Sequence, residues 1–413
     1  MAGYKARDDE KSQLVPETTS RGSATSAILL LAIAAFAAQA MVRVTDSLLP
    51  QIAADLNVTV GATSIIVTLY LLAHGSAQLV AGPVSDRFGK YRCTAIAATF
   101  ATIMVLACGL ASSLPMLVAA RLGSGLATGW IIPLALAFVG DVIPYERRQQ
   151  VIGSFLSGQI GGQLFGQAAG GVLGDLFGWR NVFFLLAAML AVATVGLYVE
   201  LWRNPLTREK SHDSRRQGFI ASYATVLRSP WARVVIVMGF IEFGMMFGAF
   251  TFVGADLHLR FGVSFTLVGL SVGFFAVGGL MYSFFVRSLV SRLGQAGLAT
   301  GGGALAAVAF AALAVMPTPW VAPFATVAIG FGFYMLHNTL QTNATQMTPE
   351  ARGTALGAFS SALYLGQTAG VAAGAVVFDR HGAVPVFASA SIALLALGLW
   401  CGHRIKQRQA LPA

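Results

Sequence analysis

Four ionisable side chains lie inside long apolar stretches of this chain: Arg43, Asp46, Arg121 and Glu242. Such a group costs roughly 2.5–3.5 kcal/mol at the centre of a bilayer, so those present are usually functional or paired. Gln39, Arg43 and Asp46 share one helical face, and Asp46 is predicted to pair with Arg43 or with Arg121. Such a pair either carries protons or only holds helices together, and the sequence leaves both roles open.

Glu242 lies near the middle of its apolar stretch, and His337 is the one basic side chain of the second half expected at a matching depth. Burial penalises the charged form of a carboxyl group, so an isolated Glu242 is expected to take up a proton readily. This property suits a group that loads and unloads protons. We therefore predict Glu242 as the proton carrier, with Asp46 and Arg121 as further proton-coupling residues.

Uncharged polar side chains form stripes at helical spacing in the same apolar stretches. Residues three or four apart lie on one face of a helix, so these stripes are able to face one cavity. Helix–helix hydrogen bonding is the alternative role, worth about 0.6 kcal/mol for each contact. The predicted substrate-binding residues are Arg43, Tyr70, His74, Gln78, Trp130, Gln163, Tyr334, His337, Asn338, Tyr364 and Gln367.

No pattern typical of catalysis accompanies these residues. The six His are dispersed without metal-ligand spacing, and no nucleophile–base pair appears. The run Gly301-Gly302-Gly303 follows no predicted strand, so it indicates helix packing rather than a nucleotide site. The basic residues are scattered and form no stripe for nucleic acid. We expect no enzyme, no metal, no cofactor and no nucleic-acid partner.

The elements that carry these residues are expected to be membrane helices. Of 413 residues, 56% are hydrophobic and 11% charged, whereas a soluble chain carries roughly 25% charged residues. A helix needs about 20 apolar residues to cross a bilayer. Twelve spans are predicted, at residues 26–49, 62–84, 94–112, 116–139, 150–173, 181–201, 233–254, 265–286, 297–316, 320–340, 354–377 and 384–403.

The positive charges predict the orientation of these spans. Of the 27 Lys and Arg, 22 fall in alternate segments that include both chain ends, which places both ends in the cytoplasm. The predicted divisions are a disordered cytoplasmic tail at 1–23, six-helix bundles at 24–201 and 231–403, a cytoplasmic linker at 202–230 and a cytoplasmic tail at 404–413. Within the linker, Phe219–Leu227 is either an amphipathic surface helix or part of a solvated basic segment.

Residues 146–183 recur in register at residues 350–387. Both copies are strongly apolar, which indicates one membrane unit duplicated in the same direction, and two parallel halves around a central crevice are typical of transporters. The fold class is therefore an all-α membrane protein of twelve helices in two six-helix bundles. The matching pairs are Glu146/Glu350, Arg148/Arg352, Gly153/Gly357, Phe155/Phe359, Ser157/Ser361, Gly162/Gly366, Gln163/Gln367, Gly166/Gly370, Ala168/Ala372, Gly170/Gly374, Asp175/Asp379, Gly178/Gly382 and Phe183/Phe387.

The loop at 82–90 resembles motif A (G-x-x-x-D-R-x-G-R/K) of the major facilitator superfamily. In that family the motif is implied to latch the two halves together when the outside is open. Asp86 is expected at the start of the eleventh span, where exposed N–H groups attract an anion. The implied latch residues are Gly82, Asp86, Arg87, Gly89, Lys90 and Asp141.

Two further motifs point to the drug:proton antiporter branch of the superfamily. Gly162, Gly166 and Gly170 resemble motif C, with Gln167 where that motif usually has Pro, and they are expected to pack helices closely. Arg121 stands in a segment similar to motif B, which implies a role in proton transfer or substrate contact.

The resemblance implies a secondary transporter that exports a small amphipathic compound or drug by proton antiport and alternating access. Alternatives are a uniporter or proton symporter for a small metabolite, which Arg43 and Arg121 would allow to be anionic, and, in another class, a non-transporting membrane receptor or lipid scramblase. We expect a monomer in the lipid bilayer of a bacterial inner membrane.

Overall fold

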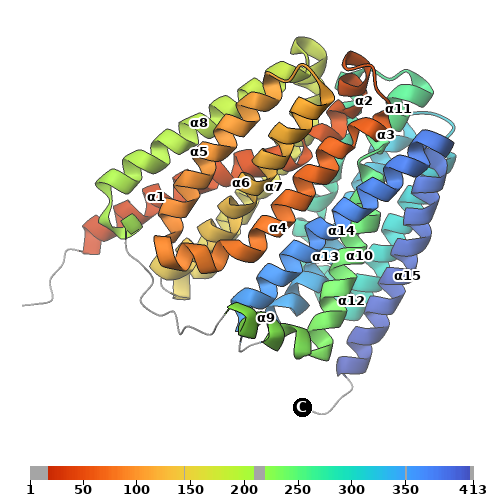
Figure 1. Cartoon of the computed structure of the whole chain (residues 1–413). Helices are drawn as coiled ribbons and strands as arrows, with labels where there is room; N and C mark the ends of the chain where they lie inside the picture. The colour runs from red at the N-terminus through yellow and green to blue at the C-terminus, as the bar shows by residue number, and fades with distance from the viewer. Residues whose placement is uncertain (1–16, 144, 209–218, 349–350, 410–413) are drawn as a thin grey trace, which may run out of the picture.

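The computed structural model describes residues 17–143, 145–208, 219–348 and 351–409, and helices make up nearly all of this part. Figure 1 shows the helices running roughly side by side, with the ends of α2, α3 and α11 meeting at the top. We call this the upper end and the opposite one the lower end. The helices of the first half are α1 (Glu17–Arg43), α2 (Thr45–Asp55), α3 (Val60–Thr63), α4 (Ile65–Phe88), α5 (Lys90–Gly109), α6 (Leu114–Val142), α7 (Tyr145–Phe177) and α8 (Trp179–Arg203).

The linker and the second half repeat this plan. A short 3-10 helix, η1 (Pro205–Arg208), follows α8. The remaining helices are α9 (Phe219–Arg228), α10 (Pro230–Phe250), α11 (Val253–Phe261), α12 (Phe265–Val315), α13 (Val321–Gln346), α14 (Arg352–His381) and α15 (Ala383–Gln409).

The described helices account for the twelve predicted spans. Nine helical segments are long and apolar enough to cross a membrane, as judged over the described residues alone. Helix α12 contains two spans, because Gly294 has φ 62° and ψ 179° and reverses the chain inside it. Such a positive φ suits glycine, which has no Cβ. Helices α7 and α13, which carry polar stripes, supply the other two spans.

Some predicted boundaries differ from the observed ones. The first span is divided at Val44, between α1 and α2, and the seventh between α10 and α11. Residues 17–23, expected in the disordered tail, belong to α1, and residues 1–16 lie outside the described part. In the linker, α9 is the helix predicted at Phe219–Leu227, and its Val226 is fully buried.

The two halves pack internally through equivalent glycines. In the first half, Gly162, Gly166 and Gly170 of α7 lie against the backbone of α1 and the start of α2. In the second, Gly366, Gly370 and Gly374 lie in the same way against α10. A side chain at these positions has no space, so the glycines allow the helix backbones to touch.

Helix packing through Gly166 leads to a stability prediction. Its missing Cβ would meet the carbonyl of Ala40, whereas Gly158 on the same helix has open space around it. Gly166→Ile is expected to lower the free energy of unfolding by about 1–3 kcal/mol, because overpacking forces the backbone apart. Thermal melting in detergent measures this, and Gly158→Ala is the matched control. Equal melting temperatures for the two variants would contradict the close contact.

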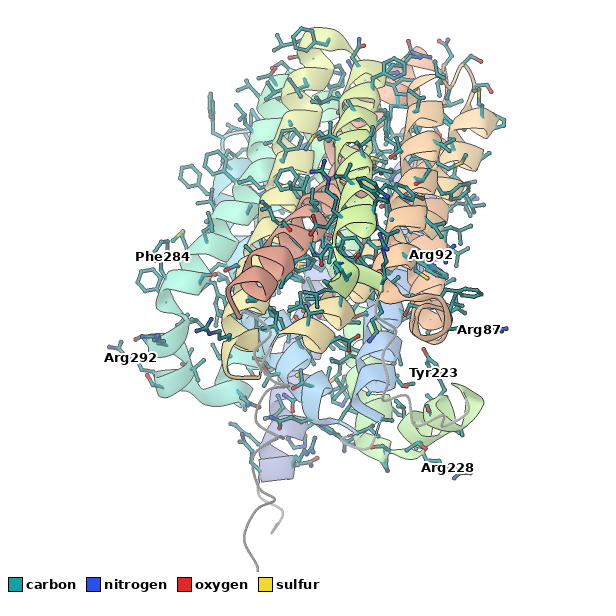
Figure 2. All side chains as sticks on the ribbon, turned by 90° about the vertical axis from the view of Figure 1, so that its left-hand side faces the viewer. Arg87, Arg92, Tyr223, Arg228, Phe284 and Arg292 are labelled. Carbon is teal, nitrogen blue, oxygen red and sulfur yellow. The ribbon has the colours of Figure 1, made fainter. Side chains whose placement is uncertain are left out.

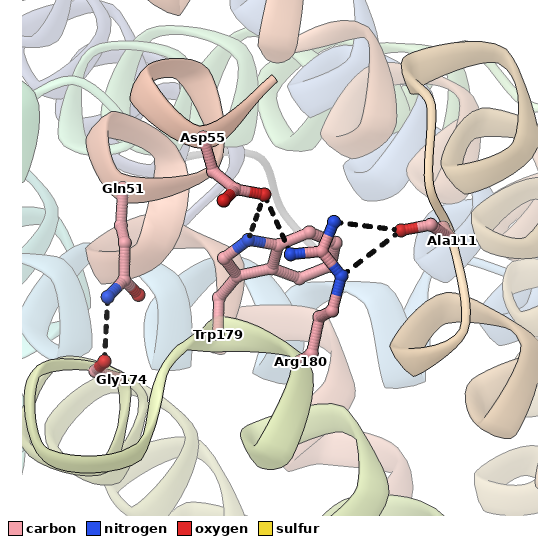
Figure 3. A network of polar contacts seen from close by, with 6 residues as sticks. All are labelled: Gln51, Asp55, Ala111, Gly174, Trp179 and Arg180. Carbon is pink, nitrogen blue, oxygen red and sulfur yellow. Dashed lines mark hydrogen bonds and ion pairs between the residues drawn. The ribbon is translucent and has the colours of Figure 1, made fainter. Parts of the chain in front are cut away.

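The upper end of the first half is held by a polar network around Asp55 (Figure 3). The Oδ2 atom of Asp55 accepts hydrogen bonds from Nη1 of Arg180 at 2.7 Å and from Nε1 of Trp179 at 3.2 Å. Arg180 also donates to the Ala111 carbonyl at 3.1 and 3.3 Å. Gln51 donates to the Gly174 carbonyl at 2.7 Å. The network fixes α2 to α7, α8 and the α5–α6 loop.

The Asp55 network is expected to weaken in acid. The hydrogen bond from Arg180 holds the pKa of Asp55 below its usual 3.8. Since the folded pKa is the lower one, the contribution is present above pH ~4 and is lost as pH falls through the folded pKa. Asp55→Asn should cost under about 1 kcal/mol at pH 7, because the pair is exposed. Melting curves at pH 7 and 3.5 measure this, and a gap that widens in acid would contradict it.

Basic and apolar side chains are distributed as a membrane requires. Figure 2 shows Arg87, Arg228 and Arg292 in the lower part of the molecule and Arg92 near mid-height. In the same view Phe284 points outward from α12, and it is 84% exposed. Exposed phenylalanine of this kind is stable against lipid, whereas the arginines need water or headgroups.

Candidate functional site

The candidate site lies where equivalent helices of the two halves face each other. Arg43 ends α1, and Phe247 lies at the position of α10 that the 204-residue repeat makes equivalent. The guanidinium of Arg43 stands over the Phe247 ring, 3.6 Å from its centroid. A polar stripe on α1 and α2 therefore meets an aromatic stripe on α10, so the duplicated halves are chemically unlike at their contact.

Arg43 and Asp46 form a loose buried ion pair. Their Nη1 and Oδ2 atoms are 3.7 Å apart, and the two side chains are 3% and 1% exposed. This distance is too long for a hydrogen bond. Two donor atoms of Arg43, Nε and Nη1, and both oxygens of Asp46 are buried without a hydrogen-bond partner. Tyr334 and Tyr364 of the second half lie in the same buried region as Arg43.

Glu242 is paired with His337, so it is not an isolated carboxylate. Its Oε2 is 3.0 Å from Nδ1 of His337, and its Oε1 is buried without a partner. The His337 ring stacks on Phe333 at 4.9 Å and lies 5.2 Å from Phe243. The ring is 12% exposed whereas Glu242 is fully buried, so His337 lies on the more accessible side of the pair.

Arg121 contacts backbone carbonyls and an aromatic ring, whereas Asp46 forms its ion pair with Arg43. Its Nη1 donates to the carbonyl of Met41 at 3.1 Å and its Nε to that of Ile66 at 3.4 Å. Its guanidinium lies 3.9 Å from the centroid of Tyr70. Arg121 thus joins α6 to α1 and α4, and its predicted part in proton coupling stays a prediction.

His74 and Tyr70 form a polar cluster that reaches the second half. Thr128 of α6 lies 2.8 Å from the Tyr70 hydroxyl and 3.1 Å from Nδ1 of His74. The His74 ring is 4.4 Å from that of Tyr364 on α14. Thr128 is absent from the sequence-based predictions, because a threonine in a helix gives no signal that separates it from packing residues.

The predicted glutamines are buried with unused polar atoms. Gln163 has a free Nε2, Gln78 a free Oε1, and Gln367 has neither side-chain atom bonded. Gln167, at the position where motif C usually has Pro, is also fully buried and unpaired. A buried polar group without a hydrogen-bond partner destabilises the fold. These atoms are therefore free to form hydrogen bonds with a polar group that enters the interior.

Other predicted residues lie elsewhere. Trp130 packs against Ala81, Cys93 and Leu134 inside the first half. Tyr334 faces Phe275 and Phe333, and Asn338 lies beside Tyr282. Of these three, Tyr334 is the one near Arg43.

Only part of the predicted latch lies in the described residues. Lys90 Nζ and Asp141 Oδ2 form an ion pair at 2.5 Å, which joins α5 to α6. Gly89 has φ 95° and separates α4 from α5. The side chain of Asp86 and residues 349–350 lie outside the described part. The contact of Asp86 with the start of α14 therefore stays a prediction.

An apolar crevice of about 320 Å³ lies between α10, α14 and α15. Phe240, Met245 and Val386 are among its lining residues, whereas Glu242, Arg43 and the polar stripes are not. Among the described residues, no group of three or more His, Cys, Asp and Glu is placed to hold a metal ion. The polar side chains described above therefore do not line this crevice.

The model of the Major Facilitator Superfamily matches residues 31–371, which is most of the chain. The chain belongs to the major facilitator superfamily. Solved superfamily folds agree with the arrangement above. A bacterial homolog of the human lysosomal transporter Spinster superposes with a TM-score of 0.71 at 16% identity, covering 96% of this chain and 100% of that one. The nucleoside transporter NupG gives 0.72 at 14% identity, covering 92% and 99%.

Related sequences are also superfamily transporters. An uncharacterized MFS-type transporter of Bacillus subtilis, YceJ, is 21% identical over 86% of this chain and 90% of its own length. Multidrug resistance protein D of Escherichia coli is 32% identical over 42% of this chain and 43% of its own. An uncharacterized MFS-type transporter of Mycobacterium tuberculosis is 32% identical, but the match covers 28% of it. The predicted superfamily fold and the predicted transporter, in place of an enzyme, are thus confirmed.

Proposed function

We propose that the protein exports a small amphipathic organic compound in exchange for protons. The observation that carries this proposal is the buried pair of Glu242 and His337, 3.0 Å apart. A carboxylate–imidazole pair that shares one proton has no net charge, and releasing that proton leaves a single negative charge, so the pair is able to load and unload one proton in an apolar interior. The efflux direction is supported by motif C glycines and by a relative named for multidrug resistance.

The proposed transport cycle uses the Glu242–His337 pair, whose two residues both belong to the second half. The pair takes up a proton from the outside and releases it on the inside when the compound binds there. The carrier therefore turns inward with a proton and outward with the compound. Aromatic rings beside His337, from Phe243, Phe333 and Phe359, provide an apolar wall for the substrate. Superfamily membership gives the alternating-access framework on which this scheme depends.

Orientation and surroundings are part of the same proposal. The lower end, which carries Arg87, Arg228 and Arg292, is the cytoplasmic one, because positive residues concentrate inside. Both chain ends are then cytoplasmic, in a bacterial inner membrane. The protein functions as a monomer, and its two bundles comprise residues 24–201 and 231–403.

A second function is favoured by Arg43. Its two unpartnered donor atoms lie in the region between the halves, so they are suited to a carboxylate or phosphate of a substrate. Protonation of Asp46 would release Arg43 for that anion. Proton and anion would then bind together, which makes the protein a proton symporter of an anionic metabolite.

Two measurements separate these functions. Purified protein is first melted with cationic, neutral and anionic amphipathic compounds, and the compound that stabilises it is then added to everted vesicles. Antiport predicts that a cationic or neutral compound raises the melting temperature and releases protons from acidified vesicles. Stabilisation by anions alone, with protons moving in the same direction as the compound, would favour the symporter.

A further inference from the structure

Two carboxylates at the upper end join the two halves in the same way. Asp379, near the end of α14, accepts hydrogen bonds from Oγ1 of Thr59 at 2.5 Å and from the N–H of Gly61 at 2.8 Å. Asp175, near the end of α7, accepts from the N–H of Thr266 at 3.0 Å and from its Oγ1 at 2.6 Å. Each carboxylate thus binds the start of a helix in the opposite half.

The two contacts are related by the internal repeat. Asp175 and Asp379 are a matched pair of the 204-residue shift, and the segments 59–61 and 264–266 correspond at a shift of 205. Duplication alone would leave both carboxylates exposed on helix ends. Instead each one reaches across to the other half, where an N–H at a helix start and a hydroxyl stabilise its charge.

The closure beneath these contacts is tight. Gly171 and Gly269 bring α7 and α12 into backbone contact, and Gly254 of α11 lies against the carbonyl of Asp46. Asp46 is 1% exposed under this layer. Farther down, the hydroxyl of Ser361 donates to the carbonyl of Gly75 at 2.8 Å, and the hydroxyl of Tyr223 in α9 donates to the carbonyl of Leu79 at 3.2 Å.

We propose that Asp175 and Asp379 are gating residues, two equivalent clasps that close the upper end and both release in each transport cycle. The clasps act on the equilibrium between the two access states and do not touch the transported compound. Their role is independent of which compound or ion is carried. Each one is exposed, so its contribution is modest, and the pair is suited to a gate that must open repeatedly.

The test measures the separation of the halves by spin labels. Labels are attached to Met116→Cys and Val384→Cys, exposed positions near the upper end of each half, in the full chain reconstituted in lipid. The native Cys93, Cys108 and Cys401 are buried and stay unlabelled. Asp175→Asn and Asp379→Asn are each expected to raise the ratio of open to closed upper ends about threefold, and the double variant about tenfold.

Two controls keep the gating role separate from a structural one. Asp55→Asn removes a charged hydrogen bond at the same end but inside one half, so the label distances should not change. Thr266→Val removes the hydroxyl and keeps the N–H donor, and a smaller opening in the same direction is expected. The proposal is overturned if the double variant keeps the wild-type distance distribution, whether or not its melting temperature falls.

Discussion

Glu242→Gln is expected to abolish proton-driven transport, with a loss of about 100-fold or more, which corresponds to about 2.7 kcal/mol. Glutamine keeps the shape of the side chain and a hydrogen bond to His337, 3.0 Å from the carboxylate. It cannot gain or lose a proton, so the pair loses the one step that couples it to the gradient. The measurement is uphill flux of the stabilising compound in vesicles with an imposed pH gradient.

The same variant should still exchange bound compound across the membrane. Exchange without a gradient needs only the alternating halves, so counterflow is expected to stay within about threefold of wild type. Asp256→Asn is the matched control, because Asp256 is also a nearly buried carboxylate of the second half, 3.6 Å from Arg260. If Glu242→Gln still drives uphill flux, the proton is carried elsewhere.

Breaking the pair of Arg43 and Asp46 is expected to have the largest effect on stability. Each side chain is almost fully buried, so removing one partner leaves an uncompensated charge. Arg43→Gln and Asp46→Asn should each lower the free energy of unfolding by about 3–5 kcal/mol. The double variant should recover most of this loss, because neither charge then remains. Thermal melting of the four proteins completes the cycle.

Transport by the double variant decides what the pair does. If the pair only joins helices, transport recovers together with stability. If Arg43 binds substrate or Asp46 carries a proton, the double variant is stable and inactive. Arg121→Gln is a useful comparison, because Arg121 bonds to carbonyls of α1 and α4. Its loss should reduce stability and leave the coupling of the remaining activity unchanged.

The contact partners of the ionisable residues were only partly predictable. Asp46 lies three residues after Arg43, so helical spacing alone brought them to one face. The choice of Arg43 over Arg121 was decided by packing, which places carbonyls of two neighbouring helices around Arg121. Matching depth in the membrane pointed from Glu242 to His337, but a distance of 3.0 Å depends on how α10 and α13 cross.

The partners of the two clasp carboxylates were also not predictable from the sequence. The repeat identified Asp175 and Asp379 as equivalent, but their partners belong to the opposite half. Sequence separation from Thr59 to Asp379 is 320 residues, and no local pattern specifies a contact over that distance. The packing of Trp130 against Ala81, Cys93 and Leu134 likewise depends on tertiary contacts, and its role in substrate binding stays a prediction.

Hydropathy, charge asymmetry and the duplicated segment determined the membrane helices, their number and the parallel halves, because these depend on burial in lipid along a single helix. Helix crossing angles and the approach of one half to the other arise from contacts among many side chains at once. Only the tertiary structure therefore decided which charged groups meet, which glycines touch backbone and which end of the protein is closed.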